Sequence, residues 1–135
     1  MTVRRDPRGI VLSMGEDVLF DAGMASVKPS SSASLGAVAA VLKKAGCDAV
    51  VEGHTDSLPI SNARYASNWE LSATRATNIL ARLVVEYNAL PARLSAAGYA
   101  EFRPVASNAN PEGRARNRRV DVVLLLAEAG GGGLR

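Results

Sequence analysis

The sequence predicts an α/β (α+β) sandwich in which two main helices pack on one face of a mixed β-sheet of about four strands. Apolar runs of strand length alternate with longer segments of helical periodicity, in the order strand–helix–strand–helix–strand–strand. The chain has 135 residues and no internal repeat, which fits one domain. Apolar residues make up 47% of it but include only two Phe and one Trp, so we expect an aliphatic core.

The first half of the chain is expected to hold two extended segments, a helix and a buried strand. Residues 9–12 and 18–20 are predicted to be extended, with a break at Gly15. A helix is expected after the hydroxyl-rich residues 29–32, because apolar residues then recur at helical spacing until Gly46 ends the pattern. The recurring residues are Leu35, Val38, Leu42 and Ala45. Residues 48–54 form a short apolar run that predicts a buried strand.

The second half is expected to hold a long helix and two further strands. Ser67 and Asn68 are predicted to cap the helix, and Glu70 in its first turn favours the helix dipole. Its buried stripe is expected to consist of Trp69, Ala76, Ile79, Leu80, Leu83 and Tyr87. Pro91 is expected to start a short turn. Residues 94–100 and 120–126 are predicted strands, and the glycines at 130–133 predict a flexible end.

Composition and charge limit the class of protein. The apolar segments are far shorter than the roughly 20 residues that a membrane span needs, and residues 1–5 do not begin a secretory signal peptide. A single cysteine, Cys47, excludes an intramolecular disulfide and is expected to be a buried apolar residue. The net charge is +3, with five Arg and one acid between residues 103 and 119. No aromatic residue interrupts residues 114–119, so a nucleic-acid platform is disfavoured and we expect no nucleic-acid partner.

Asp56 and Arg75 are the charged residues around which a binding site is expected. Asp56 follows the strand at 48–54, at the edge where open α/β sheets place ligands, and Arg75 lies near the start of the next helix. A carboxylate accepts hydrogen bonds from an ammonium, a guanidinium binds a carboxylate through two bonds, and the N–H groups of the helix start add donors. The pattern therefore suits a zwitterionic ligand. A structural Asp56–Arg75 ion pair fits the spacing equally well.

An enzyme is the weaker interpretation of the same region. His54 is the only histidine, and the sequence contains neither metal-ligand spacing nor a nucleophile elbow. A single His at a strand end is more often a hydrogen-bonded structural residue. We therefore expect no catalytic residue, no metal and no cofactor.

Several spaced motifs resemble the OmpA-like peptidoglycan-binding domain over about residues 10–126. They are Thr55-Asp56 at a strand end, the pattern Asn-x-x-Leu-Ser-x-x-Arg-Ala at residues 68–76, and Asn-Arg-Arg-Val at residues 117–120, with further matches at 19–23, 93–99 and 111–115. The resemblance implies two helices on a mixed sheet. It also divides the chain into an N-terminal extension (1–9), the OmpA-like domain (10–127) and a Gly-rich tail (128–135).

The resemblance further implies a ligand, the diaminopimelate-containing stem peptide of peptidoglycan. By this likeness Asp56 binds the ammonium at the far stereocentre of diaminopimelate, and Arg75 binds the carboxylate there. The pocket is then shaped by Thr55, Asn68, Leu71 and Arg118, and the other arginines partly face an anionic glycan. The implied function is non-catalytic anchoring of an envelope complex to the cell wall.

Within this family the chain is most similar to the flagellar stator proteins of the MotB branch. The loop after Asp56 is long and contains Pro59, and residues 67–72 and 99–105 match that branch. The likeness implies a periplasmic domain of an inner-membrane protein, a homodimer, and a MotA-like channel subunit reached through a transmembrane segment that is expected upstream of these residues. An outer-membrane anchor of the OmpA or Pal type is the alternative, although its loop is usually shorter.

Overall fold

A five-stranded mixed sheet with helices on one face forms the fold in the computed structural model, which describes residues 1–60 and 62–126. The strands are β1 (Thr2–Asp6), β2 (Gly9–Gly15), β3 (Ala49–His54), β4 (Leu94–Gly98) and β5 (Arg119–Leu125). The helices are α1 (Glu16–Leu19), α2 (Ser32–Ala45), α3 (Asn68–Tyr87) and α4 (Pro111–Asn117), with 3-10 turns at Pro29–Ser31 and Pro91–Arg93. The predicted class, a mixed sheet covered by two main helices, is confirmed, with five strands instead of about four.

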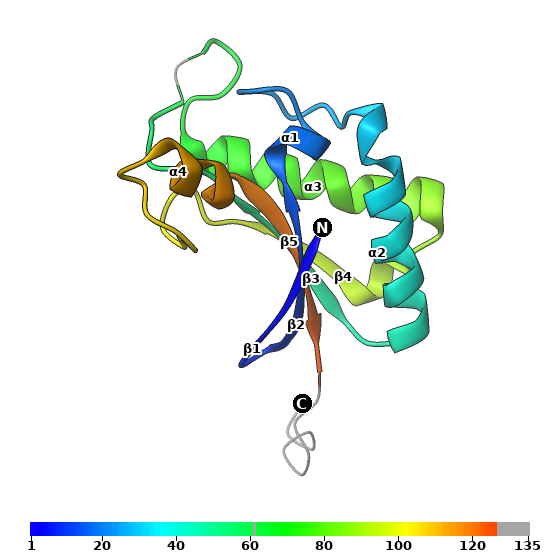
Figure 1. Cartoon of the computed structure of the whole chain (residues 1–135). Helices are drawn as coiled ribbons and strands as arrows, with labels where there is room; N and C mark the ends of the chain where they lie inside the picture. The colour runs from blue at the N-terminus through cyan, green and yellow to red at the C-terminus, as the bar shows by residue number, and fades with distance from the viewer. Residues whose placement is uncertain (61, 127–135) are drawn as a thin grey trace.

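The strand order β1-β2-β5-β3-β4 places the last strand at the centre of the sheet. β3 and β4 are parallel, as a strand–helix–strand unit requires, and the other pairs are antiparallel. Figure 1 shows α2 and α3 together on one side of the sheet, with α4 and the loop after β3 at the end away from the β1–β2 turn. Aliphatic side chains from α2, α3, β2, β3 and β5 fill the space between the layers.

The two long helices begin and end where their sequence signals indicate. Ser67 caps α3, because its hydroxyl accepts a hydrogen bond from the N–H of Glu70 (3.4 Å). Gly46 ends α2 in the left-handed conformation (φ 62°) that favours glycine. Leu35, Val38 and Leu42 of α2 are buried as expected, whereas Ala45 is exposed in the last turn.

Two segments near the N-terminus differ from the prediction. Residues 1–9 were expected to be an extension, but residues 2–6 form β1 and pair with β2 from Thr2↔Ser13 to Asp6↔Gly9. Residues 18–20 were expected to be extended, but Val18 and Leu19 belong to α1, whose first turn contains two acids that favour a helix N-terminus. Leu19 and Phe20 are buried, so their apolar character reflects burial and not a strand.

Two further differences concern the second half of the chain, and one prediction there is not tested. Trp69 was expected in the buried stripe of α3, but it is 52% exposed and stacks on Phe102 (centroids 5.3 Å apart). α4 was not predicted, although Asn110 as cap and Pro111 at the first helical position are start signals. The predicted flexible glycines lie outside the described residues.

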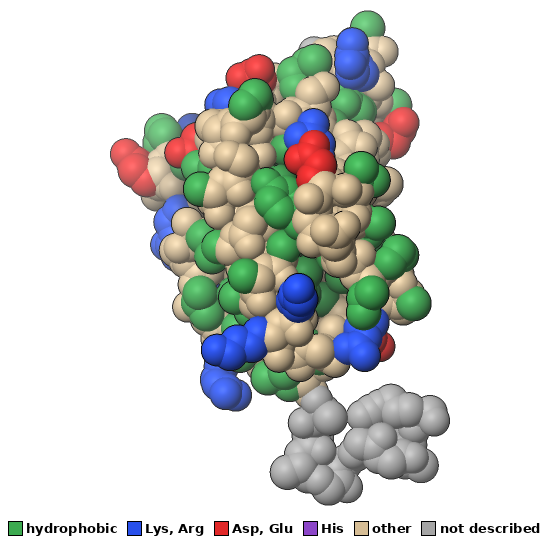
Figure 2. Space-filling model, turned by 90° about the vertical axis from the view of Figure 1, so that its right-hand side faces the viewer, with side chains coloured by type: hydrophobic (Ala, Val, Ile, Leu, Met, Phe, Trp, Pro, Cys, Tyr) green, Lys and Arg blue, Asp and Glu red, His purple; other side chains and the backbone are tan. Residues whose placement is uncertain are grey.

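The surface on the side that carries α2 is mixed in character. Figure 2 shows apolar side chains interspersed with polar ones on this side, and Lys and Arg side chains toward its lower end. In the described part of the chain, every helix is too short or too polar to cross a membrane.

Candidate ligand-binding site

Close packing of α3 against the sheet determines where the site can form. A Cβ at Gly53 would lie 2.0 Å from the backbone carbonyl oxygen of Ser72, and a Cβ at Gly98 would lie 2.4 Å from the backbone nitrogen of Ala73. Only glycine allows the helix to approach β3 and β4 this closely. The start of α3 therefore lies directly beside the loop that leaves β3.

Thr55 and Asp56 are held at the end of β3 by backbone contacts. The N–H of Thr55 donates to the carbonyl of Ala100 (2.9 Å), and the Thr55 hydroxyl donates to the carbonyl of Asp56 (2.8 Å). Asp56 Oδ1 accepts from the N–H of Leu58 (3.0 Å). Both residues are 6% exposed, so the carboxylate is fixed at the base of the loop.

A chain of alternating charges runs from Asp56 across the site. Asp56 Oδ2 accepts from Nη1 of Arg118 (2.7 Å), and Nε of Arg118 donates to Oε1 of Glu16 (3.0 Å). Oε2 of Glu16 accepts from Nη1 of Arg75 (2.8 Å). Asp56 and Arg75 are therefore connected through Arg118 and Glu16, and the structural Asp56–Arg75 ion pair that the spacing also allowed is not formed.

Arg75 has the most deeply buried side chain of these four charged residues. Its side chain is 3% exposed, its Nε donates to the carbonyl of Met24 (2.7 Å), and its Nη2 donates to the carbonyl of Asp21 (3.2 Å). Its guanidinium also lies 4.6 Å from the ring centroid of Phe20. Arg75 thus holds the segment that follows α1 against α3, in addition to facing the site.

Arg118 is the more accessible of the two guanidinium groups. Its side chain is 32% exposed and bridges Asp56 and Glu16. Burial lowers the pKa of Arg118, but the two carboxylates outweigh this effect and raise it above the usual value. The guanidinium is therefore a permanent positive charge at the mouth of the site.

Asn68 and Leu71, from the first turn of α3, complete the site. Asn68 Nδ2 donates to the carbonyl of Leu58 (3.1 Å), and its Oδ1 accepts from the N–H of Ile60 (3.1 Å). The side-chain amide thus holds the loop after Asp56 against the helix start. Leu71 is 4% exposed and contributes an apolar wall.

The structure brings all six residues singled out from the sequence to one pocket of about 280 Å³. These residues are Thr55, Asp56, Asn68, Leu71, Arg75 and Arg118; Glu16, Ala22, Gly23, Leu58, Pro59 and Ile60 complete the lining. The arrangement differs from the expectation of two unpaired opposite charges, because each charged group already has a partner. The pocket presents two carboxylates and two guanidinium groups and is formally neutral.

Sequence reasoning missed two residues that organise this pocket. Glu16 joins Arg75 and Arg118 over separations of 59 and 102 residues, which no local pattern reveals. Asn117 is 0% exposed, accepts from the N–H groups of Val105 and Ala106, and donates to two further oxygens. It anchors α4 and thereby positions Arg118.

The arginine-rich run 114–119 divides between different roles. Arg118 faces the pocket, whereas Arg119 is 6% exposed and donates to Asp121 on the opposite face of the sheet (3.1 Å). Arg114 donates to the carbonyl of Asn108 (2.9 Å), and Arg116 is exposed. Most of the run therefore serves the fold or the pocket, and Arg116 faces solvent.

The fold and the pocket define an α+β module with a charged site at the end of β3. The matching family model is the OmpA family over residues 19–118, so the chain belongs to the OmpA family.

The chain is also similar in sequence to individual proteins. It is 44% identical over 124 residues to the uncharacterized protein YtxE of Bacillus subtilis, covering 92% of this chain and 51% of that protein. It is 37% identical over 119 residues to motility protein B of the same organism, covering 87% and 45%. The chain thus spans about half the length of these relatives. The structure of the cell wall anchor of the type VI secretion system of Pseudomonas aeruginosa has 35% identity and a TM-score of 0.82, with coverage of 93% and 88%.

Proposed function

We propose that this chain is a non-catalytic module that binds the diaminopimelate-containing stem peptide of peptidoglycan and so attaches an envelope complex to the cell wall. The observation that carries the proposal is the pocket in which Asp56, Arg118, Glu16 and Arg75 alternate in charge. The likeness to a cell wall anchor and to motility protein B supports it.

The far end of diaminopimelate carries an ammonium and a carboxylate on one carbon, which matches this charge pattern. Asp56 uses one acceptor site on each oxygen, so its carboxylate can accept further bonds from the ammonium. Arg75 uses three of its five N–H donors, and Arg118 uses two of its five, which leaves donors for the ligand carboxylate. A zwitterion adds no net charge to a pocket that is already neutral.

In this proposal the remaining residues set the shape of the pocket. Thr55 and Asn68 fix the loop that carries Asp56, and Leu71 contacts the methylene chain of the ligand. Arg75 binds the ligand from a buried position, while Arg118 binds it from the more accessible position at the mouth of the pocket.

The test is binding of the Asp56→Asn variant to purified sacculi and to a soluble diaminopimelate-containing muropeptide. The change keeps the shape of the side chain but removes the charge that the ammonium needs. A lost charge-assisted hydrogen bond is worth about 1.5–3 kcal/mol, so we expect the muropeptide affinity to fall by about 10- to 150-fold.

The matched control is Asp48→Asn, an exposed acid at the other end of β3. It is expected to bind like the parent chain, and circular dichroism should show that both variants are folded. Parental affinity in a folded Asp56→Asn variant would refute the assignment of the pocket. Muropeptides released from sacculi by the parent chain would instead show that the module is an enzyme.

We further propose that the complex attached by this module is a flagellar stator, with the chain in the periplasm and the full-length protein in the inner membrane. The likeness to motility protein B and the match at residues 67–72 support this choice over an outer-membrane anchor or a secretion-system anchor. Co-purification of the full-length protein with a MotA-like channel subunit, as a homodimer by light scattering, is the expected result. Recovery of the full-length protein in the outer-membrane fraction would contradict it.

A further inference from the structure

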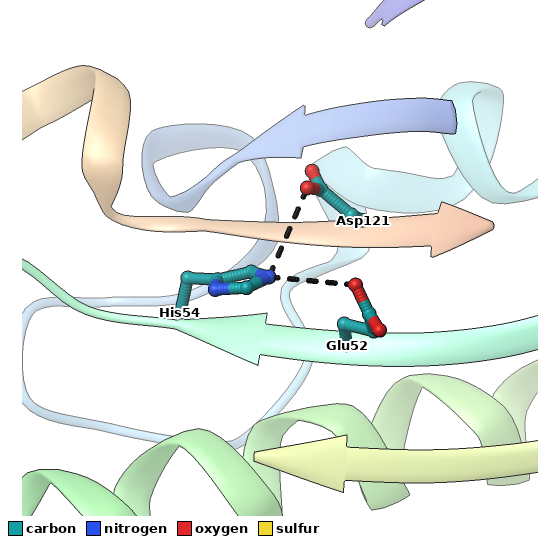
Figure 3. Close-up of side chains that lie close together, drawn as sticks. All are labelled: Glu52, His54 and Asp121. Atoms are coloured by element: carbon teal, nitrogen blue, oxygen red, sulfur yellow. Dashed lines mark ion pairs between the residues drawn. The ribbon is translucent and has the colours of Figure 1, made fainter. Parts of the chain in front are cut away.

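A cluster of three metal-ligating side chains lies apart from the pocket, on the face of the sheet opposite α2 and α3. Glu52 and His54 of β3 and Asp121 of β5 alternate with the core residues Val51 and Val122, so they point to the other face. Their exposed fractions are 3%, 3% and 1%. Figure 3 shows one ring nitrogen of His54 pointing toward both carboxylates.

The geometry of the cluster is compact. His54 Nε2 lies 3.8 Å from Glu52 Oε1 and 3.8 Å from Asp121 Oδ2, and one ligand atom from each residue lies within 4.8 Å of the others. Three such atoms around a tetrahedral Zn²⁺ at about 2.0–2.2 Å would be about 3.3 Å apart. The two 3.8 Å separations therefore need to close by about half an ångström, and ligand atoms as far apart as 4.8 Å by about 1.5 Å, for the side chains to share one ion.

His54 is buried without a hydrogen bond, contrary to the expectation of a hydrogen-bonded structural histidine. Among the described residues, neither ring nitrogen of His54 nor Oδ1 of Asp121 has a hydrogen-bond partner. The ring is held by stacking on Tyr99, 5.5 Å away, whose other contact is the guanidinium of Arg103 at 4.4 Å. Buried polar atoms without partners are costly and rare, so these atoms are candidates for binding a ligand.

Arginines occupy one oxygen of each carboxylate and leave the other without a hydrogen bond from residues 1–60 and 62–126. For Glu52 the occupied oxygen is the one remote from His54, whereas for Asp121 it is Oδ2, the oxygen 3.8 Å from His54 Nε2. Arg8 donates to Oε2 of Glu52 (2.6 Å), and Arg119 and Arg4 both donate to Oδ2 of Asp121 (3.1 Å each). Glu52 Oε1 and Asp121 Oδ1 accept no hydrogen bond from these arginines. Such outer hydrogen bonds orient carboxylates that bind a metal.

Ion pairs with arginines set the charge around the cluster. Glu52 pairs with Arg8, and Asp121 pairs with Arg4 and Arg119. Arg8 is shared with Asp6 (2.8 Å), and the side chains of Arg8 and Arg4 are 39% and 40% exposed. Solvent therefore screens the repulsion of a cation by Arg8 and Arg4, whereas the charge of Arg119, whose side chain is 5% exposed, is balanced by its ion pair with Asp121.

We propose that Glu52, His54 and Asp121 bind a divalent transition-metal ion of the Zn²⁺ type. One imidazole and two carboxylates are ligands that suit Zn²⁺. An open pocket of about 210 Å³ adjoins the three residues and is also lined by Arg4, Arg8, Arg103 and Arg119. The ion would join β3 to β5 two residues before Asp56 and so secure the strand end that carries the proposed peptidoglycan pocket, although the metal site does not depend on that function.

The test uses the whole chain, stripped with a chelator, dialysed and titrated with ZnCl₂ by calorimetry. We expect one ion per chain and, at a hundredfold excess over Kd, a rise of about 10 °C in the thermal midpoint. His54 is the only histidine, so the imidazole signals in a ¹⁵N NMR titration can be assigned to it directly. Saturable Zn²⁺-dependent shifts of Nε2 are expected.

Variants separate this site from adventitious binding. His54→Gln and Asp121→Asn should each weaken Zn²⁺ binding at least tenfold, whereas Cys47→Ser and Glu86→Gln, which remove a thiol and an exposed acid elsewhere, should not change it. The inference is overturned if the His54 ring responds to pH but not to Zn²⁺, if His54→Gln binds like the parent, or if Cys47→Ser abolishes binding. The NMR titration decides the matter on the parent chain even if a variant fails to fold.

Discussion

Glu16→Gln is the substitution that tests most sharply how the charged pocket is held together. Glu16 accepts one hydrogen bond from Arg75 (2.8 Å) and one from Arg118 (3.0 Å). Its side chain is 15% exposed and that of Arg75 only 3%, so the Glu16–Arg75 pair is largely removed from water. The substitution keeps the shape of the residue and removes its charge.

The expected loss follows from the burial of each partner. Breaking a buried ion pair by removing one member costs about 3–5 kcal/mol. The Gln amide oxygen can still accept one bond, which recovers about 1 kcal/mol. Arg118 is about one-third exposed and still pairs with Asp56, so its share is small, at about 0–1 kcal/mol. We therefore expect the free energy of unfolding to fall by about 2–5 kcal/mol.

Urea unfolding followed by far-ultraviolet circular dichroism measures this loss. The single tryptophan, Trp69, is 52% exposed and is a poor reporter of core packing. Asp17→Asn is the matched control, because Asp17 is an exposed neighbour in α1 whose Oδ1 accepts only from the N–H of Val18. It should change stability by less than about 0.5 kcal/mol. A loss that small for Glu16→Gln as well would show that Arg75 does not depend on Glu16.

Two further substitutions test how the pocket is positioned. Gly53→Ala places a Cβ 2.0 Å from a backbone carbonyl oxygen of α3 and should lower the free energy of unfolding in urea by about 3 kcal/mol or more. The control is Gly36→Ala, whose Cβ would meet only a side chain at 3.6 Å and which should leave stability unchanged or raise it. Equal effects of the two substitutions would refute the close-packing argument. Asn117→Ala removes four hydrogen bonds at the α4–β5 junction and should lower both stability, by about 2–4 kcal/mol, and muropeptide affinity. Unchanged affinity would show that α4 does not position Arg118.

Periodicity and capping residues predicted the parts of the fold that depend on local signals. The apolar spacing of α2, the Ser67 cap of α3 and the apolar runs of β3 and β5 all correspond to observed elements. The six site residues meet at one pocket because their motifs lie at the end of β3, at the start of α3 and directly before β5, which the topology brings together.

The features that were missed depend on contacts remote in sequence. β1 contains two arginines and an aspartate with one valine, so no apolar alternation marks it; its pairing with β2 and the contact of Arg4 with Asp121 hold it in place. Glu16 has no local signature, because its partners come from α3 and from the residue before β5. The cluster around His54 likewise forms only when β3 and β5 pair.

The proposed recognition of both charges of the ligand is tested most directly by comparing two muropeptides. One carries diaminopimelate and the other carries lysine, which has the ammonium but lacks the second carboxylate. If Arg75 and Arg118 bind that carboxylate, calorimetric titration should show binding to the diaminopimelate form that is tighter by about 10- to 150-fold. Equal affinity for the two muropeptides would contradict the account.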